Sequence, residues 1–145
     1  MDNWNKALEF YLKTPKEIIQ FPVAPSEFTV SYPSLNKTLN VLNFGEVSIL
    51  GENSLRTWSI SSFFPSQQYS FCQCKPKAPN WYCKTIDELK TSKTVCRIIV
   101  PTTRLNSACS IGEFNWGVKD GTRDIYFNIN FQEHKVLGRD KLVVI

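Results

Sequence analysis

The strand that decides the fold is residues 124–132, whose sequence is DIYFNINFQ. Apolar side chains occupy every second position of this stretch, and mostly polar side chains occupy the positions between them. Successive side chains of a β-strand point to opposite faces, so a period of two predicts a long strand with one buried and one polar face. We expect Ile125, Phe127, Ile129 and Phe131 to lie in the core.

Shorter patterns of the same kind extend along the chain on the N-terminal side of this strand. Residues 119–122, Lys-Asp-Gly-Thr, predict the tight turn before it, because Asp-Gly tolerates positive φ at both central positions. Further strands are predicted at residues 8–13, 18–23, 28–32, 39–43, 47–51, 55–64, 95–100 and 108–116. The first two form an opening hairpin, and the chain as a whole is predicted to be mainly β.

One short helix is predicted at about residues 85–92. Thr85 stands three residues before Glu88, which is the spacing of a capping box, where each side chain bonds the backbone N–H of the other residue. The preceding stretch, residues 66–80, has no clean period and contains two prolines. We interpret it as a long connection, and loops of that length are often functional.

Length and composition predict a single domain over residues 1–145. The chain is 42% hydrophobic and 21% charged, which is ordinary for a globular protein. Its net charge of +4 is spread over lysines interleaved with acids, whereas a nucleic-acid binder usually concentrates its excess in one stripe. The sequence has neither an apolar run that could span a bilayer nor the pattern of a secretory signal. We therefore expect synthesis in the cytoplasm, no membrane partner and no specific nucleic-acid partner.

Candidate catalytic residues are scarce. The single histidine, His134, lies where the alternating strand ends beside Glu133 and Lys135, and we interpret it as an exposed polar residue rather than a member of a catalytic triad. Isolated glycines exclude a phosphate-binding loop, and scattered carboxylates give no glycosidase pair. The prediction is a protein that is not an enzyme, with no catalytic residue and no cofactor.

The cysteines are candidate metal ligands. Cys72, Cys74, Cys83 and Cys96 could supply four thiolates to zinc, but structural sites usually pair their ligands as Cys-x₂₋₄-Cys, and here one residue separates the first pair. Cys109 is the fifth cysteine. We predict that all five are reduced and that no metal site is present.

The remaining features are those of a subunit that docks to other proteins. The candidate interface consists of aromatic side chains and an apolar C-terminal segment: Phe63, Phe64, Trp81, Tyr82, Trp116, Leu142 and Val143. The alternative is a β-module that binds a carbohydrate or a cell surface through Trp81, Tyr82 and Trp116. Trp81 and Tyr82 could also stack on nucleic-acid bases, although core or interface packing is the commoner use of such aromatics.

A family resemblance rests on the order of several segments. Phe21-Pro22-Val23-Ala24-Pro25 is followed by GEVSILG at 45–51, LRTWSISSFFP at 55–65, RIIV at 97–100, IGEF at 111–114 and DIYFNINFQEHK at 124–135. In this order they resemble the amino-terminal domain of the LysM-bearing baseplate proteins of contractile-tailed phages, prophages and tailocins of Gram-positive bacteria. The resemblance covers roughly residues 8–136. The family commonly continues into a LysM module, and this sequence carries no LysM start, so no LysM module is expected in this chain.

The resemblance implies a fold and a place in an assembly. The fold would be a tail-tube-like β-barrel or β-sandwich with one flanking helix. The protein would be a structural subunit of a phage tail or phage-like particle, joining the tail tube to the baseplate hub. Its partners would be tail tube, hub, and wedge or sheath-initiator subunits, with a homohexameric ring by analogy. It would reside in the virion tail or baseplate after assembly in the host bacterial cytoplasm.

Overall fold

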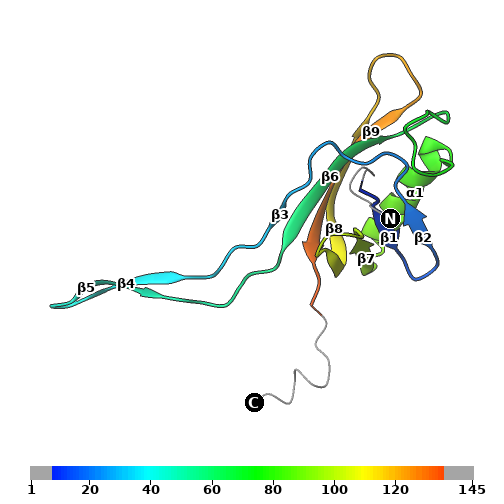
Figure 1. The fold of residues 1–145 in the computed structure, drawn as a ribbon. Helices are drawn as coiled ribbons and strands as arrows, with labels where there is room; N and C mark the ends of the chain where they lie inside the picture. The colour runs from blue at the N-terminus through cyan, green and yellow to red at the C-terminus, as the bar shows by residue number, and fades with distance from the viewer. Residues whose placement is uncertain (1–7, 136–145) are drawn as a thin grey trace.

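A computed structural model describes residues 8–135 of the chain (Figure 1). The described part is mainly β, as predicted. Its strands are β1 (Tyr11–Lys13), β2 (Ile18–Gln20), β3 (Val30–Ser31), β4 (Lys37–Val41), β5 (Gly45–Ile49), β6 (Thr57–Phe64), β7 (Cys96–Ile99), β8 (Asn106–Gly117) and β9 (Ile125–Glu133). Seven of them form one antiparallel sheet in the order β2-β1-β7-β8-β9-β6-β3, and β4 and β5 form a separate two-stranded ribbon.

The predicted strand at residues 124–132 is confirmed as β9, an interior strand of this sheet. β9 pairs with β6 on one side and with β8 on the other. Phe127, Ile129 and Phe131 are buried, and the side chains between them lie on the opposite, outer face. Asp124 differs from expectation, because it was placed on the polar face and is buried.

The sheet curves so that its two ends share one core. The predicted opening hairpin is confirmed as β1 and β2. Phe21, directly after β2, stacks on Phe127 of β9 at a centroid distance of 6.0 Å and on Phe64 of β6 at 6.4 Å. Within residues 8–135 the sheet stays open at β2 and β3, so the fold is sandwich-like and not a closed barrel.

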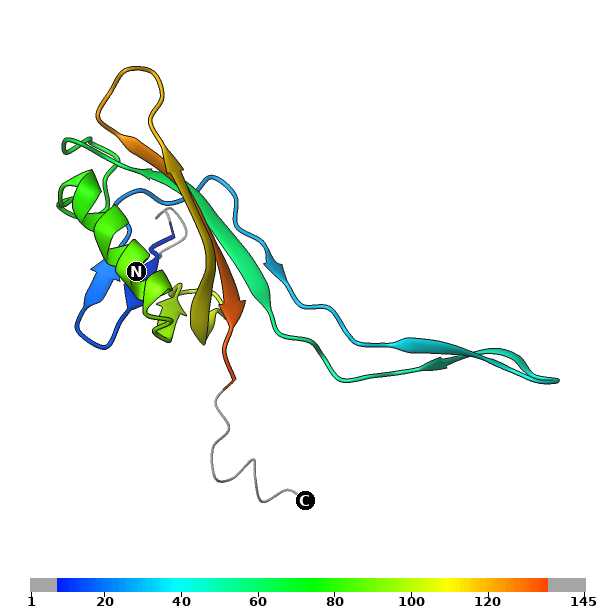
Figure 2. The ribbon, with the colours of Figure 1, turned by 180° about the vertical axis from the view of Figure 1, so that it is seen from behind.

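The single helix of the described residues, α1 (Pro79–Thr91), covers the inner face of the sheet (Figures 1 and 2). It begins six residues before the predicted start at Thr85, and proline suits the first helical turn because its missing N–H needs no partner there. The predicted capping box is wrong, since Thr85 lies inside the helix and its Oγ1 donates to the Trp81 carbonyl at 2.8 Å. Tyr82, Cys83 and Ile86 form the buried face. This helix is too short and polar to cross a membrane, and the described residues contain no other.

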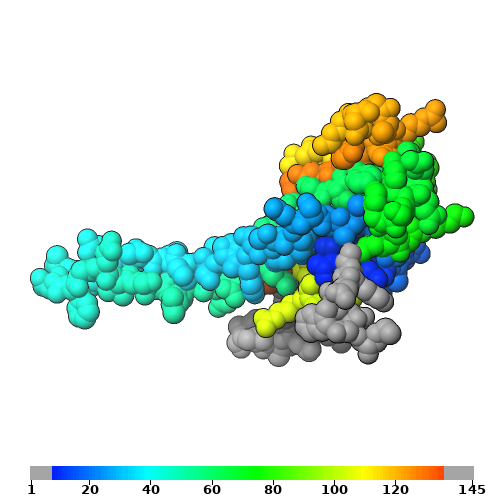
Figure 3. Space-filling view, turned by 45° about the horizontal axis from the view of Figure 1, so that its top comes forward, coloured from blue at the N-terminus to red at the C-terminus, as the bar shows by residue number. Residues whose placement is uncertain are grey.

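Residues 32–56, here called the arm, leave the body between β3 and β6 (Figures 1 and 2). The arm is a long hairpin with β4 and β5 near its end. In the space-filling view it stands clear of the body (Figure 3). None of its residues belongs to the hydrophobic core cluster or packs against it.

Candidate assembly interface

The backbone of the arm is held by a ladder of hydrogen bonds. Near the body, the Ser54 N–H donates to the Pro33 carbonyl at 2.8 Å and the Leu35 N–H donates to the Glu52 carbonyl at 2.7 Å. Further out, Gly51 must be glycine, because a Cβ there would lie 1.8 Å from the Leu35 carbonyl oxygen. The ladder therefore persists far beyond the sheet that anchors it.

The strand register gives the arm two different faces. Leu39 lies opposite Val47, and Val41 lies opposite Gly45, so these apolar side chains share one face, which ends at Lys37 opposite Ile49. The other face carries two polar pairs, Thr38 with Ser48 and Asn40 with Glu46.

Within residues 8–135, nothing covers the apolar face of the arm. Leu39 is 49% exposed, Val41 is 41% exposed and Ile49 is 43% exposed. In antiparallel sheets with one polar and one apolar face, the apolar face is normally packed against a core. A two-stranded ribbon alone is also only marginally stable in water. The arm therefore has the chemistry of a surface that another protein covers.

The tip of the arm is its most exposed apolar part. Leu42 is 89% exposed and Phe44 is 82% exposed. Asn43 and Gly45 have φ values of 68° and 91°, which asparagine and glycine tolerate better than other residues. This backbone presents the two apolar side chains at the turn.

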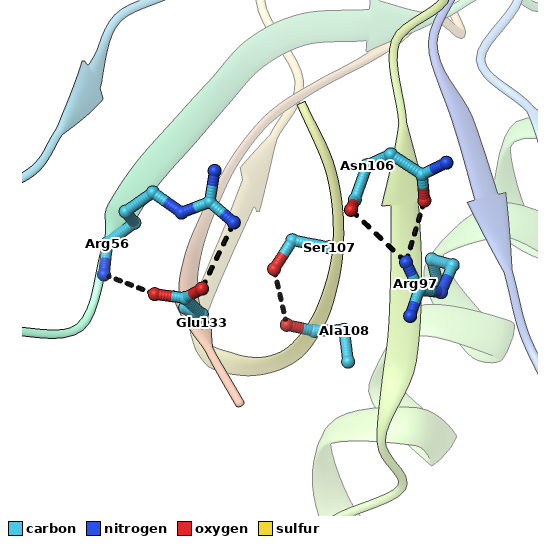
Figure 4. Close-up of polar contacts among 6 residues, drawn as sticks. All are labelled: Arg56, Arg97, Asn106, Ser107, Ala108 and Glu133. Carbon is cyan, nitrogen blue, oxygen red and sulfur yellow. Dashed lines mark hydrogen bonds and ion pairs between the residues drawn. The ribbon is translucent and has the colours of Figure 1, made fainter. Parts of the chain in front are cut away.

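The root of the arm is fixed to the body by an ion pair (Figure 4). The Arg56 guanidinium Nη2 lies 3.0 Å from Glu133 Oε2, and the Arg56 backbone N–H donates to Glu133 Oε1 at 3.0 Å. Burial alone would raise the pKa of the Glu133 carboxyl, but these hydrogen bonds and the guanidinium charge outweigh it and hold that pKa below its ordinary value. Nearby, Arg97 Nη1 donates to the carbonyl and the side-chain oxygen of Asn106 (Figure 4).

An aromatic cluster lies at the end of β6 that is remote from the arm. It comprises Phe63, Tyr69, Phe71 and Tyr126. Phe63 contacts each of the other three rings at centroid distances of 5.2–6.2 Å, and Tyr69 stacks on Phe71 at 5.0 Å. Phe71 is 54% exposed, so the cluster opens to solvent.

A hollow of about 360 Å³ adjoins this cluster. Phe63 and Tyr126 belong to both. The lining of the hollow is Val23, Ala24, Pro25, Ser26, Ser61, Ser62, Phe63, Lys119, Tyr126 and Phe127. Lys119 is its only charged member, and its Nζ lies 4.4 Å from the centroid of the Tyr126 ring.

Asp124 anchors the loop that carries half of the cluster. Its carboxylate accepts hydrogen bonds from the Ser66 N–H, the Ser66 hydroxyl and the Tyr69 hydroxyl, each at 2.7 Å. Burial alone would raise the pKa of this carboxyl, but the three donors outweigh burial and lower it. Its place in an alternating strand suggested only an exposed polar residue.

The predicted interface residues fall into different environments. Phe63 lies in the aromatic cluster, whereas Phe64 and Tyr82 are buried in the core and stack on each other at 4.6 Å. Trp116 is 59% exposed. Leu142 and Val143 lie outside the described residues. The arm, which the sequence analysis took as ordinary strands, was missed as a candidate surface.

Trp81, one of the three aromatic residues of the alternative carbohydrate-binding module, lines a groove of about 880 Å³ between α1 and the β1–β2 turn. The Lys77 ammonium lies 3.9 Å from the centroid of its indole ring, so one face of that ring is already covered. Trp116 does not line this groove. The two tryptophans therefore do not form one platform.

The potential catalytic and metal-ligating residues are dispersed over residues 8–135 and do not form one site. His134 is exposed, and its backbone N–H donates to the Ala108 carbonyl at 2.8 Å. All five cysteines have free thiols. Cys96 and Cys109 lie opposite each other in the core, where burial raises their pKa values to about 11 and about 12. No group of three or more potential metal ligands occurs within residues 8–135.

Comparison with known proteins gives one relative in sequence and several in structure. No family model matches the sequence. The chain is 30% identical over 139 residues to YqbP of Bacillus subtilis (strain 168), a protein described as uncharacterized. The match covers 92% of this chain, which spans 62% of the length of YqbP.

The solved structures that match include chains of gene transfer agent particles. A chain of the tail of the empty particle, determined with sixfold symmetry, matches with a TM-score of 0.56 and 12% identity, over 91% of this chain and 94% of that chain. A chain of the native virion matches with a TM-score of 0.55 and 9% identity, over the same shares. The fold is shared with a chain of a gene transfer agent tail.

Proposed function

We propose that this chain is a structural subunit of a contractile phage tail or a phage-like particle, where it joins the tail tube to the baseplate hub through protein–protein contacts. The observation that carries the proposal is the arm, whose apolar face no other part of residues 8–135 covers. The shared fold with a tail chain of a sixfold particle supports it, and so does the resemblance of the sequence to baseplate proteins. A homohexameric ring, with tube, hub and wedge or sheath-initiator subunits as neighbours, belongs to the same proposal.

The proposal assigns no enzymatic activity, cofactor or membrane partner to the chain. The dispersal of the potential catalytic and metal-ligating residues over residues 8–135 supports this assignment. The protein would be made in the host bacterial cytoplasm and would reside in the tail or baseplate of the particle. Its described residues would act as one tail domain.

The test is incorporation of arm variants into particles. Leu39→Ser with Val47→Ser replaces the central apolar pair of the arm, and Thr38→Ala with Ser48→Ala changes the neighbouring polar pair as a matched control. We expect the first variant to be depleted at least tenfold from purified particles, while the control is incorporated like the wild type. Both should unfold like the wild type, because the arm lies outside the core.

Two results would overturn the proposal. One is equal incorporation of the two variants, and the other is absence of the wild-type chain from particles. Imaging of labelled wild-type chain in the particle tests whether the chain lies at the junction of the tail tube and the baseplate. A label away from the junction of tube and baseplate would remove the assignment to that junction.

A further inference from the structure

We infer that the tip of the arm docks in the hollow beside the aromatic cluster of a second copy of this chain, an inference that rests on the proposed function. The contact joins Leu42 and Phe44 of one copy to Phe63 and Tyr126 of the next. Each copy of the chain therefore carries both surfaces of the interface, the tip that inserts and the hollow that receives it.

The two surfaces lie at opposite ends of the molecule. β6 begins at the root of the arm with Thr57 and ends beside the cluster with Phe64. The arm points away from the loops that bear the cluster in both ribbon views (Figures 1 and 2). The tip therefore reaches such a hollow only on another molecule. A contact between two different surfaces of identical chains is head-to-tail, and it closes into a ring or continues as a stack.

The chemistry of the tip fits the lining of the hollow. The tip offers one aromatic and one aliphatic side chain, both more than four-fifths exposed. The hollow offers Val23, Ala24 and Pro25 beside two aromatic rings. Aromatic side chains in well-packed central pockets are frequent sources of binding energy at protein interfaces. A volume of about 360 Å³ lies within the range of pockets that hold small molecules.

The charges of the two surfaces are complementary. Beyond Lys37, the first residue of β4, the outer part of the arm (residues 38–51) contains one charged residue, Glu46. The lining of the hollow also contains one charged residue, Lys119. Such a pair would fix the register of the contact and disfavour wrong pairings.

The larger groove beside α1 fits the tip less well. Its lining includes five charged residues of both signs: Lys16, Glu17, Lys84, Asp87 and Glu88. A nearly neutral apolar tip would leave most of these charges without partners while taking water from them. The hollow is the better acceptor on this ground.

A charge swap in the full chain tests the inference. Self-association is measured by sedimentation velocity over a range of concentrations. We expect Glu46→Lys and Lys119→Glu each to weaken it at least tenfold. The double variant, and an equal mixture of the two single variants, should restore it to within threefold of the wild type. Glu52→Lys on the arm and Lys16→Glu in the groove are matched controls and should change little. Failure of the double variant to restore association, or a loss with Lys16→Glu in place of Lys119→Glu, would overturn the inference.

A second measurement identifies the partner inside the particle. A photo-crosslinking amino acid at position 44 should join residues 61–63 or 119–127 of a second copy. A crosslink only to a different tail protein, or a wild-type chain that stays monomeric, would overturn the docking inference while leaving the proposed function standing. Absence of the chain from particles would remove the proposed function, and the charge swap would still decide the docking contact.

Discussion

At the scale of single residues, position in the central strand decides the role of each side chain. Phe127 is 5% exposed and lies within the aromatic core, stacked on Phe64 at a centroid distance of 4.1 Å. Asn128, the next residue, points to the outer face, and its buried Oδ1 has no hydrogen-bond partner. Neighbouring residues of one strand should therefore differ widely in what they contribute to stability.

Phe127→Ala should lower the free energy of unfolding by about 3–5 kcal/mol, because it removes a buried ring and leaves a cavity. Asn128→Ala is the matched control and should change stability by less than about 1 kcal/mol, since its amide oxygen forms no bond that would be lost. Denaturant unfolding of both variants is the measurement. A silent Phe127→Ala beside a destabilising Asn128→Ala would show that the two faces of the strand are interchanged.

Asp124 should make stability depend on pH in the acid range. Its pKa in the folded protein is lowered, so its contribution is present above the unfolded value of about 3.9 and is lost as the pH falls through the folded pKa. Asp124→Asn should cost about 1–2 kcal/mol at pH 7, because a neutral amide accepts the three hydrogen bonds less well. The difference from wild type should shrink at pH 3 in denaturant unfolding. A constant difference from pH 7 to pH 3 would contradict the assigned cause.

At the scale of elements, prediction succeeded where the pattern and the surroundings agree. The strand at 124–132 alternates apolar and polar residues, and its apolar face is covered in the structure. The period of two was therefore sufficient to predict both the strand and its buried face. The helix was found but its start was misplaced, because α1 has no side-chain cap and its first-turn proline looks like part of a loop. Asp124 and Tyr82 were misplaced because their burial depends on partners far away in sequence.

The arm shows what such patterns leave out. Alternation at Leu39, Val41 and Val47 correctly predicts strands with one apolar face. It contains no information on what covers that face. Only the three-dimensional structure shows that the ribbon stands apart from the core and that its apolar face is exposed. The candidate site could therefore not be chosen from the sequence.

Within the arm, Gly51→Ala should disrupt the ribbon without unfolding the body. The added Cβ would collide with the Leu35 carbonyl, so the hydrogen bonds near the break should open. Hydrogen exchange in residues 33–54 should accelerate at least tenfold, and incorporation into particles should fall. Gly117→Ala is the control, because nothing lies within 4 Å of a Cβ there. Unchanged exchange in the arm would contradict the close approach at Gly51.

At the scale of the whole molecule, the described residues form a body that contains the hydrophobic core and an arm that lies outside that core. The core is assembled from α1 and the strands of the seven-stranded sheet, and the arm contributes nothing to it. Stability and assembly should therefore respond to separate sets of substitutions. That separation can be tested by removing the arm.

Replacing residues 34–53 by Asn-Gly would remove the arm and leave its first hydrogen bond, from the Ser54 N–H to the Pro33 carbonyl, to close a short hairpin. Asn-Gly suits a two-residue turn of this kind because both residues adopt positive φ readily. The shortened chain should keep its free energy of unfolding within about 1 kcal/mol of the wild type, since it loses no core contact. It should be absent from particles and should not self-associate. A full-length variant with Leu42→Ser and Phe44→Ser keeps the arm but makes its tip polar. Its body should be as stable as that of the shortened chain, and its assembly should be impaired to the same degree. A shortened chain that unfolds would mean that the body depends on the arm, and one that still enters particles would place the essential contact elsewhere on the body.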